Sequence, residues 1–219
     1  MSSLGLASYI LDIIGTVAFA VAGAMVAVSR RMDLFGVLSM GTVTAMGGGV
    51  IRDVLLGQFP PRAFYNYTYI YLSLAAALVV FLAVLMLRDI YRKSHLTVEA
   101  INNIFDAIGL ASFSVTGVQI AIQAGHEENW IFCVFLGMMT GVGGGILRDI
   151  LCCTVPLVFT KHIYAVASIA GNLMYYLLAR FSVNEIAAVL ISMLVVIAIR
   201  MLATIYRWNL PRIRFSIEE

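Results

Sequence analysis

The stretch MGGGVIRDVL at residues 46–55 recurs as VGGGILRDIL at residues 142–151, so both copies carry three glycines followed by an Arg-Asp pair. The segment DIIG at residues 12–15 also recurs, as DAIG at residues 106–109. Whole motifs that return at a nearly constant spacing indicate an internal duplication. The sequence therefore predicts two copies of one structural unit.

The composition places these copies in a membrane. Of the 219 residues, 62% are hydrophobic and 12% are charged, and the mean hydropathy is +0.97. A soluble domain is about half apolar and about a quarter charged, so a water-soluble enzyme is excluded. The net charge of +2 is too small to indicate a nucleic-acid partner. A membrane-spanning helix needs about 20 apolar residues, and seven segments qualify: 7–28, 34–56, 67–87, 101–124, 130–152, 162–179 and 184–206.

Each copy contains three of these segments. Because three is odd, the second copy enters the membrane from the opposite side, which makes an inverted repeat. The sequence predicts an all-α polytopic membrane protein with seven transmembrane helices: a first three-helix repeat in residues 1–93, an inverted three-helix repeat in 94–181, and a seventh helix with a short cytoplasmic tail in 182–219. Such folds commonly place ion or substrate sites at the repeat interface. A duplication that only builds a stable bundle is the alternative.

The basic residues indicate the orientation, because short cytoplasmic loops are enriched in Lys and Arg. An outside N-terminus puts two basic residues, Arg62 and Arg180, in outer segments and ten in inner segments. The ten are Arg30, Arg31, Arg88, Arg92, Lys93, Lys161, Arg200, Arg207, Arg212 and Arg214. We therefore expect the N-terminus outside and the C-terminus in the cytoplasm.

The glycine triplets allow two interpretations. A glycine lowers helix stability by about 1 kcal/mol relative to alanine, so residues 47–49 and 143–145 are expected to break the second and fifth helices and to present backbone groups to an ion. Close packing is the alternative, because small residues at i, i+4 and i+8, such as Gly137, Gly141 and Gly145, let helices approach. Both interpretations can hold together. A phosphate-binding loop is not expected, since no strand precedes the glycines.

Arg52 and Arg148 indicate a functional site more specifically than the glycines do, because an intramembrane arginine normally faces a partner or a wet cavity. The depth of each residue along its helix predicts two ion pairs, Asp12 with Arg52 and Asp106 with Arg148, one near each end of a path between the repeats. The adjacent aspartates, Asp53 and Asp149, are expected to point elsewhere. With all six groups ionised, the interior would carry a charge of −2 and would favour cations.

The remaining polar residues indicate no enzyme. The threonines, among them Thr44 and Thr140, are expected to line the path or, more often, to bond back to their own helices. The three histidines do not cluster, and Cys133, Cys152 and Cys153 make no spaced metal motif. We therefore expect no metal, no cofactor and no catalytic residues.

The doubled Gly-Gly-Gly-x-x-Arg-Asp motif, the Asp-x-x-Gly segments before it and the extra helix resemble the prokaryotic branch of the trimeric intracellular cation channel (TRIC) family, also labelled a glycine-transporter domain. The resemblance covers residues 8–205. It implies a homotrimer in the lipid of a prokaryotic plasma (inner) membrane, with a potassium-permeable pore in each protomer bordered by kinked second and fifth helices. The implied pore residues are Gly47, Gly48, Gly49, Arg52, Asp53, Gly143, Gly144, Gly145, Arg148 and Asp149, with Asp12 and Asp106 at the acidic positions.

Two functions follow. The first is a passive channel for monovalent cations such as potassium, without strong selection over sodium, because the chain has no carbonyl filter of the Thr-Val-Gly-Tyr-Gly kind. The second is a carrier for glycine or another small zwitterion, since Arg and Asp together could hold a carboxylate and an ammonium group. The sequence does not separate them. A non-transporting scaffold is a third, weaker hypothesis.

Overall fold

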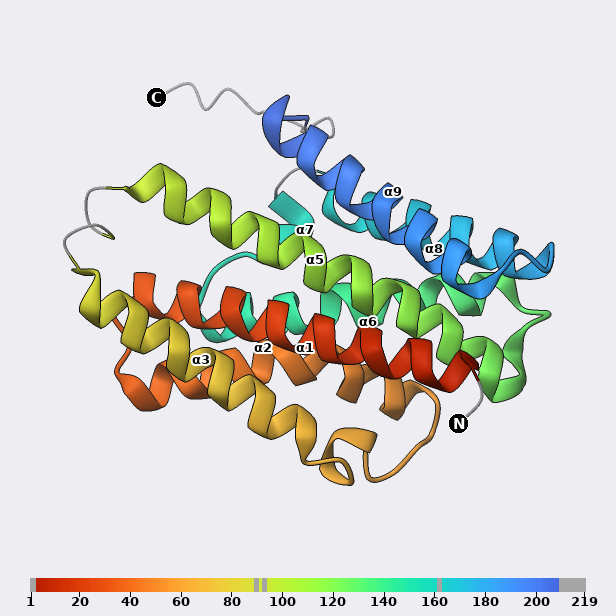
Figure 1. The fold of residues 1–219 in the computed structure, drawn as a ribbon, viewed down its shortest axis with the longest axis horizontal. Coiled ribbons are helices and arrows are strands. Elements are labelled where there is room, and N and C mark those ends of the chain that lie inside the picture. Colours follow the sequence, from red (N-terminus) through yellow and green to blue (C-terminus); the bar gives the residue numbers. More distant parts are fainter. Residues whose placement is uncertain (1–2, 89–90, 92–93, 161–162, 209–219) are drawn as a thin grey trace, which may run out of the picture.

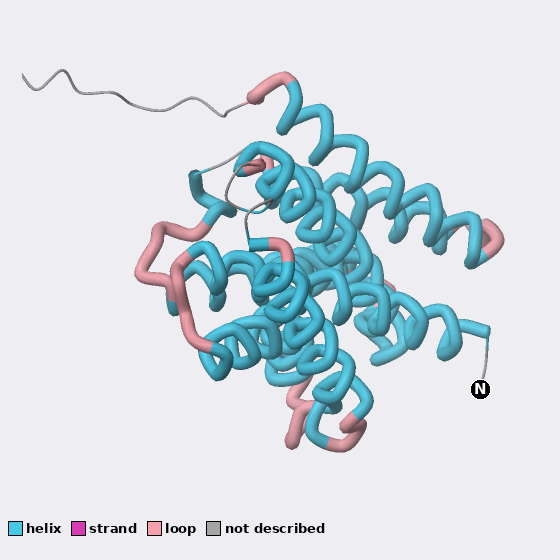
Figure 2. The backbone as a smooth tube through the Cα atoms, turned by 60° about the vertical axis from the view of Figure 1, so that its left-hand side comes forward, coloured by secondary structure: helices cyan, strands magenta, loops and turns pink. Residues whose placement is uncertain are grey.

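The computed structural model describes residues 3–88, 91, 94–160 and 163–208. These residues form helices and loops and contain no strand (Figure 2). The elements are α1 (Ser3–Ser29), α2 (Leu34–Leu55), the 3-10 turn η1 (Arg62–Phe64), α3 (Thr68–Met86), α5 (His95–Ala121), the π-helical turn η2 (Ile122–His126), α6 (Trp130–Leu151), α7 (Leu157–Thr160), α8 (Tyr164–Arg180) and α9 (Glu185–Ile205). Five basic residues used to predict the orientation lie outside the described residues: Arg92, Lys93, Lys161, Arg212 and Arg214.

The described part of the chain has six helices that are long and apolar enough to cross a membrane: α1, α2, α3, α5, α6 and α9. The predicted sixth segment, residues 162–179, corresponds to α8, which has 17 residues. Helix α8 is shorter than these six helices. It is also less apolar, because its buried side carries Ser168, Gly171 and Asn172. The expected count of seven spanning helices is therefore not confirmed by length and composition.

Side-chain caps fix where three of the helices begin. The carboxylate of Asp33 accepts a hydrogen bond from the backbone N–H of Gly36 at 2.8 Å, and the Asn129 side chain accepts one from Phe132 at 3.0 Å. Asn184 does the same at the start of α9. Each cap satisfies an N–H group that the first turn of a helix leaves without an intrahelical partner.

The helices pack as two related halves. Within the first half α1 packs on α2, and within the second α5 packs on α6. Across the halves α1 lies along α5 and α2 lies along α6 (Figure 1). The third helix of each half covers its own pair: α3 contacts α1 and α2, and α8 contacts α5 and α6. Helix α9 packs on α5 and α8 and has no equivalent in the first half.

The centre of the bundle is the contact of α2 with α6 at the glycine triplets. A Cβ atom added to Gly48 would overlap the backbone carbonyl oxygen of Thr140, and one added to Gly144 would overlap that of Thr44. Gly48 is equivalent to Gly144 and Thr44 to Thr140, so each contact is the repeat copy of the other, as two-fold symmetry between the repeats requires. Backbones come this close only where a side chain is missing.

The predicted breaks at the triplets are not found, because α2 and α6 are helical throughout residues 34–55 and 130–151. The packing interpretation is the one that the geometry supports. Tertiary contact outweighs the low helix propensity of glycine, since a continuous helix keeps its backbone hydrogen bonds while the missing side chains admit the neighbouring backbone.

The other cross-repeat contact, of α1 with α5, is built from two aromatic rings. Phe19 and Phe113 are equivalent in the two repeats, and their ring centroids lie 5.4 Å apart. Each ring covers a glycine of the opposite helix, Phe113 over Gly15 and Phe19 over Gly109. Both phenylalanines are buried, at 0% and 4% exposure.

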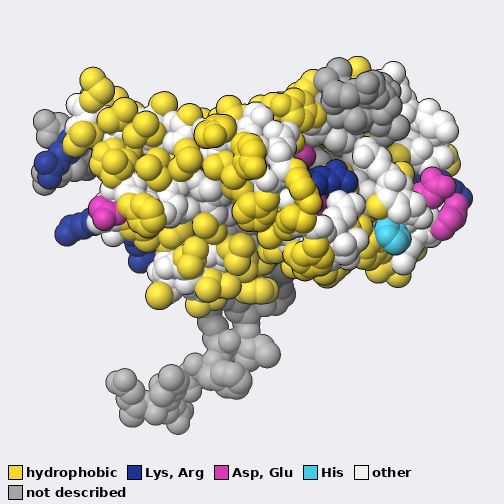
Figure 3. All heavy atoms as spheres, turned by 90° about the horizontal axis from the view of Figure 1, so that it is seen from below, with side chains coloured by type: hydrophobic (Ala, Val, Ile, Leu, Met, Phe, Trp, Pro, Cys, Tyr) yellow, Lys and Arg dark blue, Asp and Glu magenta, His cyan; other side chains and the backbone are white. Residues whose placement is uncertain are grey.

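The outside of the bundle is largely apolar. Leucine, valine and isoleucine side chains of α3 and α9 are exposed, among them Val79, Leu82, Leu190 and Leu194. Figure 3 shows apolar side chains over most of one face, with charged groups gathered at its two ends and in one gap between them. Exposed apolar surface on this scale indicates a lipid environment.

We predict that Gly48→Ala lowers stability while Gly49→Ala does not. The added methyl of Gly48→Ala meets a backbone carbonyl that cannot move away, and overpacking of this kind costs about 1–3 kcal/mol. The methyl of Gly49→Ala meets only Arg52 Nη2, at 3.7 Å. Thermal unfolding in detergent should show a lower midpoint for the first variant and an unchanged or higher one for the second. Equal midpoints would contradict the packing role.

Candidate functional site

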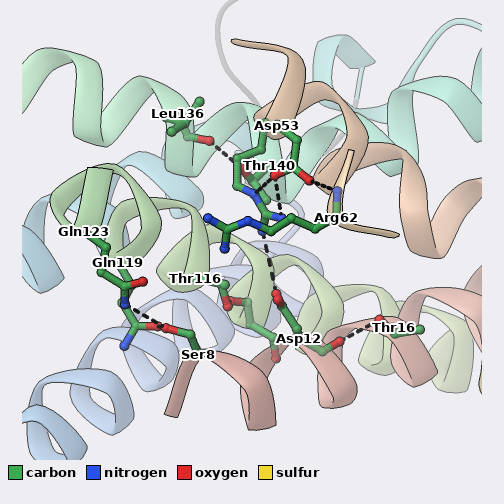
Figure 4. A network of polar contacts seen from close by, with 12 residues as sticks. Ser8, Asp12, Thr16, Asp53, Arg62, Thr116, Gln119, Gln123, Leu136 and Thr140 are labelled. Carbon is green, nitrogen blue, oxygen red and sulfur yellow. Dashed lines mark hydrogen bonds and ion pairs between the residues drawn. The ribbon is translucent and has the colours of Figure 1, made fainter. Parts of the chain in front are cut away.

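The first cluster of ionised groups lies where α1 meets the end of α2. The Arg52 guanidinium, 4% exposed, lies with its Nη1 3.8 Å from the Asp12 carboxylate, as the repeat predicts. Figure 4 shows the Asp12 side chain pointing away from its own helix, toward the end of α2 that carries Asp53. The predicted pair is therefore confirmed, although its separation exceeds hydrogen-bond length.

The expectation that Asp53 points away from its neighbour is wrong. Arg52 donates from Nε to Asp53 Oδ1 at 2.9 Å, and its Nη2 lies 2.9 Å from the same oxygen. The other oxygen, Oδ2, accepts from the backbone N–H of Arg62 at 2.7 Å. Because adjacent helical residues project about 100° apart, sequence spacing argued against the bond, but the long arginine side chain reaches across that angle.

The second cluster repeats this arrangement. Arg148 donates from Nη1 to Asp106 Oδ1 at 3.0 Å, which confirms the predicted pair, and from Nε to Asp149 Oδ1 at 2.9 Å. Asp149 Oδ2 accepts from the backbone N–H of Leu157 at 2.8 Å. In both repeats, therefore, the aspartate after the arginine ties the following loop to the helix, and Asp149 also does not point elsewhere as expected.

Arg200 belongs to the second cluster, although its place among the inner basic residues predicted a cytoplasmic loop. It lies in α9, is 3% exposed, and places its Nη2 3.6 Å from Asp106 Oδ2. Its guanidinium also lies over the ring of Tyr164, 4.5 Å from the centroid. Its position inside the apolar segment 184–206 was the signal that could have shown this.

Arg200 changes the charge of the interior. The first cluster holds two aspartates and one arginine, and the second holds two of each. With every group ionised, the total is −1 rather than the expected −2, and the excess negative charge belongs to the first cluster.

A cavity of about 210 Å³ opens beside the first cluster. Asp12, Gly49, Arg52 and Asp53 line it, as do residues that sequence reasoning missed: Ser8, Tyr69, Arg62 and Gln123. Asp12 Oδ1 is buried there and makes no hydrogen bond among the described residues. A carboxylate oxygen in that position can take a cation or a water molecule.

A polar chain borders the same cavity (Figure 4). Ser8 donates to Gln119 Oε1 at 3.1 Å and accepts from Gln123 Nε2 at 3.3 Å. These residues join the start of α1 to the end of α5, close to the π-helical turn. No single sequence motif marks them, since only the packing of α1 on α5 brings them together.

The other predicted path residues lie at the α2–α6 contact rather than on this cavity. Gly47 and Gly143 face Leu147 and Ile51 of the opposite helix. Thr44 and Thr140 donate to the carbonyls four residues earlier, at 2.7 Å and 2.6 Å, which confirms the expected back-bonding. Gly145 lies nearest to Tyr164 and Arg148 of the second cluster.

We predict that Asp149→Ala destabilises the protein strongly. The variant removes one of the two carboxylates that hold the buried Arg148 and frees the loop before α7, and breaking a buried pair costs about 3 kcal/mol or more. Glu128→Ala is the control, because its partner Arg180 is exposed and exposed pairs contribute little. The unfolding midpoint in detergent should fall for the first variant only. Similar midpoints for both would show that the buried cluster adds nothing to stability.

Comparisons with known proteins agree with the duplicated fold. The family model described as glycine transporter matches residues 9–84 and again residues 103–180, once in each repeat. A UPF0126 membrane protein of Deinococcus radiodurans is 42% identical over 171 residues, covering 77% of this chain and 75% of that protein. The UPF0126 inner membrane protein YadS of Escherichia coli K12 is 36% identical over 215 residues, covering 96% and 97%.

Solved structures with the same fold are TRIC cation channels. One, solved to explain conductance, has a TM-score of 0.80 at 37% identity and covers 94% of this chain and 97% of its own. The TRIC trimeric intracellular cation channel orthologue from Rhodobacter sphaeroides has a TM-score of 0.81 at 29% identity, with coverages of 92% and 98%. The chain therefore belongs to the glycine-transporter family of membrane proteins, together with the UPF0126 proteins, and has the fold of the prokaryotic TRIC channels.

Proposed function

We propose that this protein is a channel for monovalent cations such as potassium, with a path inside each protomer. The observation that carries the proposal is the Asp12 carboxylate, whose Oδ1 lies buried on a cavity without a hydrogen-bond partner among the described residues. The same fold in TRIC cation channels supports it. These structural neighbours are channels rather than enzymes, so no catalytic activity is proposed.

The electrostatics of the first cluster favour a cation. Two carboxylates face the buried Arg52 guanidinium there, which leaves one negative charge on the buried groups, while the Arg62 side chain that also lines the cavity is exposed to solvent. A cleft with apolar walls and one sign of charge concentrates counter-ions. Ser8, Thr16, Tyr69 and Gln123 also line the cavity, and side-chain oxygens of such residues can replace part of the water around a cation.

The proposed path runs from this cavity alongside the close-packed α2–α6 contact to the second cluster. Gly49 borders the cavity, and Gly145 lies beside the second cluster, so the two triplets lie between the ends of the path. No carbonyl filter is involved, and the channel is expected to discriminate weakly between potassium and sodium.

The topology that accompanies this proposal has seven spanning helices, with α8 as the short sixth. The N-terminus is outside and the C-terminus cytoplasmic. After removal of the buried Arg200, nine basic residues remain for the inner segments against two for the outer ones, which keeps the asymmetry typical of cytoplasmic loops. A prokaryotic inner membrane is the proposed location, in keeping with the inner membrane protein of Escherichia coli.

A carrier for glycine or another small zwitterion is the second candidate, because Arg52 and Asp12 lie 3.8 Å apart on one cavity and the family model carries that description. The guanidinium, however, already binds Asp53 through two of its nitrogens. A substrate carboxylate would have to compete with this buried pair. The geometry therefore favours the channel.

Potassium flux and glycine exchange, measured in parallel in proteoliposomes, separate the two candidates. Rapid potassium flux without saturable glycine uptake is the expected result. Saturable glycine exchange without ion flux would overturn the channel.

We predict that Asp12→Asn lowers potassium flux by about tenfold or more. A unit charge about 4 Å from an ion contributes up to about 4 kcal/mol at an effective dielectric of 20, and the nearly isosteric amide removes that attraction while keeping the shape of the cavity. Glu128→Gln, which changes an exposed carboxylate at a helix connection, is the matched control and should leave flux unchanged. Equal flux through both folded variants would remove Asp12 from the path.

We further propose that the protein is a homotrimer in the lipid bilayer with three independent paths, and we predict graded behaviour in mixed trimers. Native mass spectrometry of the purified protein should give three protomers. When wild-type and Asp12→Asn protomers are co-reconstituted, single assemblies should show zero to three conductance steps of wild-type size. A single conductance level that disappears with one variant protomer would indicate a shared central pore instead.

A further inference from the structure

The two clusters are equivalent by the repeat but are not alike. Asp12 and Asp106, Arg52 and Arg148, and Asp53 and Asp149 correspond one to one. Beside Asp12 lies the cavity, with Tyr69 on its wall. Beside Asp106 lie the Arg200 guanidinium and Tyr164, both 3% exposed. The space that is open in the first half is therefore filled by a cationic side chain in the second.

Arg200 lies farther from the Asp106 carboxylate than Arg148 does. Its Nη2 lies 3.6 Å from Asp106 Oδ2, beyond ordinary hydrogen-bond length, whereas Arg148 holds Oδ1 of the same carboxylate at 3.0 Å. Asp106 Oδ2 and Tyr164 Oη are both buried and make no hydrogen bond among the described residues. Two oxygens that lack hydrogen-bond donors, beside an aromatic face that attracts cations, are suitable ligands for a hard monovalent cation.

We propose that Asp106 and Tyr164 form a second monovalent-cation site, the counterpart of the Asp12 site, and that the guanidinium of Arg200 occupies it as a tethered cation. In the state described here, the second half of the path is closed by this side chain. The proposal rests on the proposed function, since a closed half has a consequence for flux only if cations use the path.

Helix α9 is what makes the halves different. It has no equivalent in the first repeat and packs on α5 and α8, the two helices that carry Asp106 and Tyr164. With Arg200 in place the second cluster is electrically neutral, and without it the cluster would carry the same single negative charge as the first. Any displacement of α9 that withdraws the guanidinium therefore restores a negative site at this end.

The direct test counts bound ions. Thallium(I), a potassium substitute with a usable radioisotope, is equilibrated with the purified full-length protein, and bound ions per protomer are measured. Arg200→Gln, which keeps length and polarity but removes the charge, should bind one more ion than the wild type. The double variant Arg200→Gln with Asp106→Asn should lose that extra ion. Arg180→Gln, which neutralises an exposed arginine, is the matched control and should bind as the wild type does.

Two further measurements keep the test decisive if Arg200→Gln does not fold. Arg200→Lys retains the tethered charge and should bind no additional ion. In the wild-type background, Asp106→Asn should leave thallium binding unchanged because the site is already occupied, while Asp12→Asn should reduce it. A folded Arg200→Gln without an extra ion, or an Asp106→Asn that loses as much binding as Asp12→Asn, would overturn the proposal.

Measurements of ion flux separate the proposed Arg200 site from the proposed channel function. In proteoliposomes, Arg200→Gln should raise thallium flux by about tenfold, because a blocking charge next to the ion is removed. If neither the wild type nor Arg200→Gln conducts while the variant still binds the extra ion, the channel function fails and the tethered-cation site stands. If the wild type conducts and the variant gains neither ion nor flux, the site fails and the channel stands.

Discussion

The close approach of two backbones, α2 and α6, is the constraint on which the rest of the structure depends. Gly48 and Gly144 receive the carbonyl oxygens of Thr140 and Thr44, and each contact is the image of the other. In a lipid environment helices gain little from hydrophobic burial against one another, so backbone-to-backbone packing is a principal source of association. With α2 packed on α6, the preceding helices α1 and α5 also pack against each other, and Phe19 contacts its repeat equivalent Phe113.

The Arg-Asp pairs that end α2 and α6 act on the loops as well as on the interior. In both repeats one aspartate oxygen holds the arginine, and the other holds a backbone N–H of the following loop. The arginine is thereby fixed in one orientation and extends its remaining nitrogen toward the aspartate of the preceding helix. The same aspartate thus positions the arginine and anchors the following loop, and it does so in both repeats. This dual role is a physical reason for an aspartate directly after the arginine.

The repeat provides two similar clusters of charged residues, and α9 removes the similarity. Helix α9 brings Arg200 to Asp106 and leaves Asp12 beside an open cavity. A duplicated bundle without an added helix would hold the same charge in each cluster. With every buried group ionised, the first cluster keeps one excess carboxylate and the second is neutral, and this difference follows from the Arg200 side chain, which comes from outside the repeat.

The helical membrane fold, the duplication and the Asp-Arg pairs could be predicted from the sequence, because they depend on composition, recurrence and depth along a helix. The pairs of Asp12 and Asp106 followed from rise per residue alone. The behaviour of the triplets, the partners of Asp53 and Asp149 and the burial of Arg200 could not, since each depends on which backbone or side chain of another helix lies opposite. Glycine weakens an isolated helix, yet α2 and α6 stay helical through their glycine triplets because their backbones pack closely there.

The sequence by itself determined that the chain is a helical membrane protein built from two repeated units with charges at equivalent positions, because apolar periodicity and repetition can be read along the chain alone. Only the tertiary structure decided which half holds a cavity and which is filled. That outcome depends on the packing of α9 against α5 and α8, and a side chain 52 residues beyond Arg148 reaches the same carboxylate only when the helices are assembled.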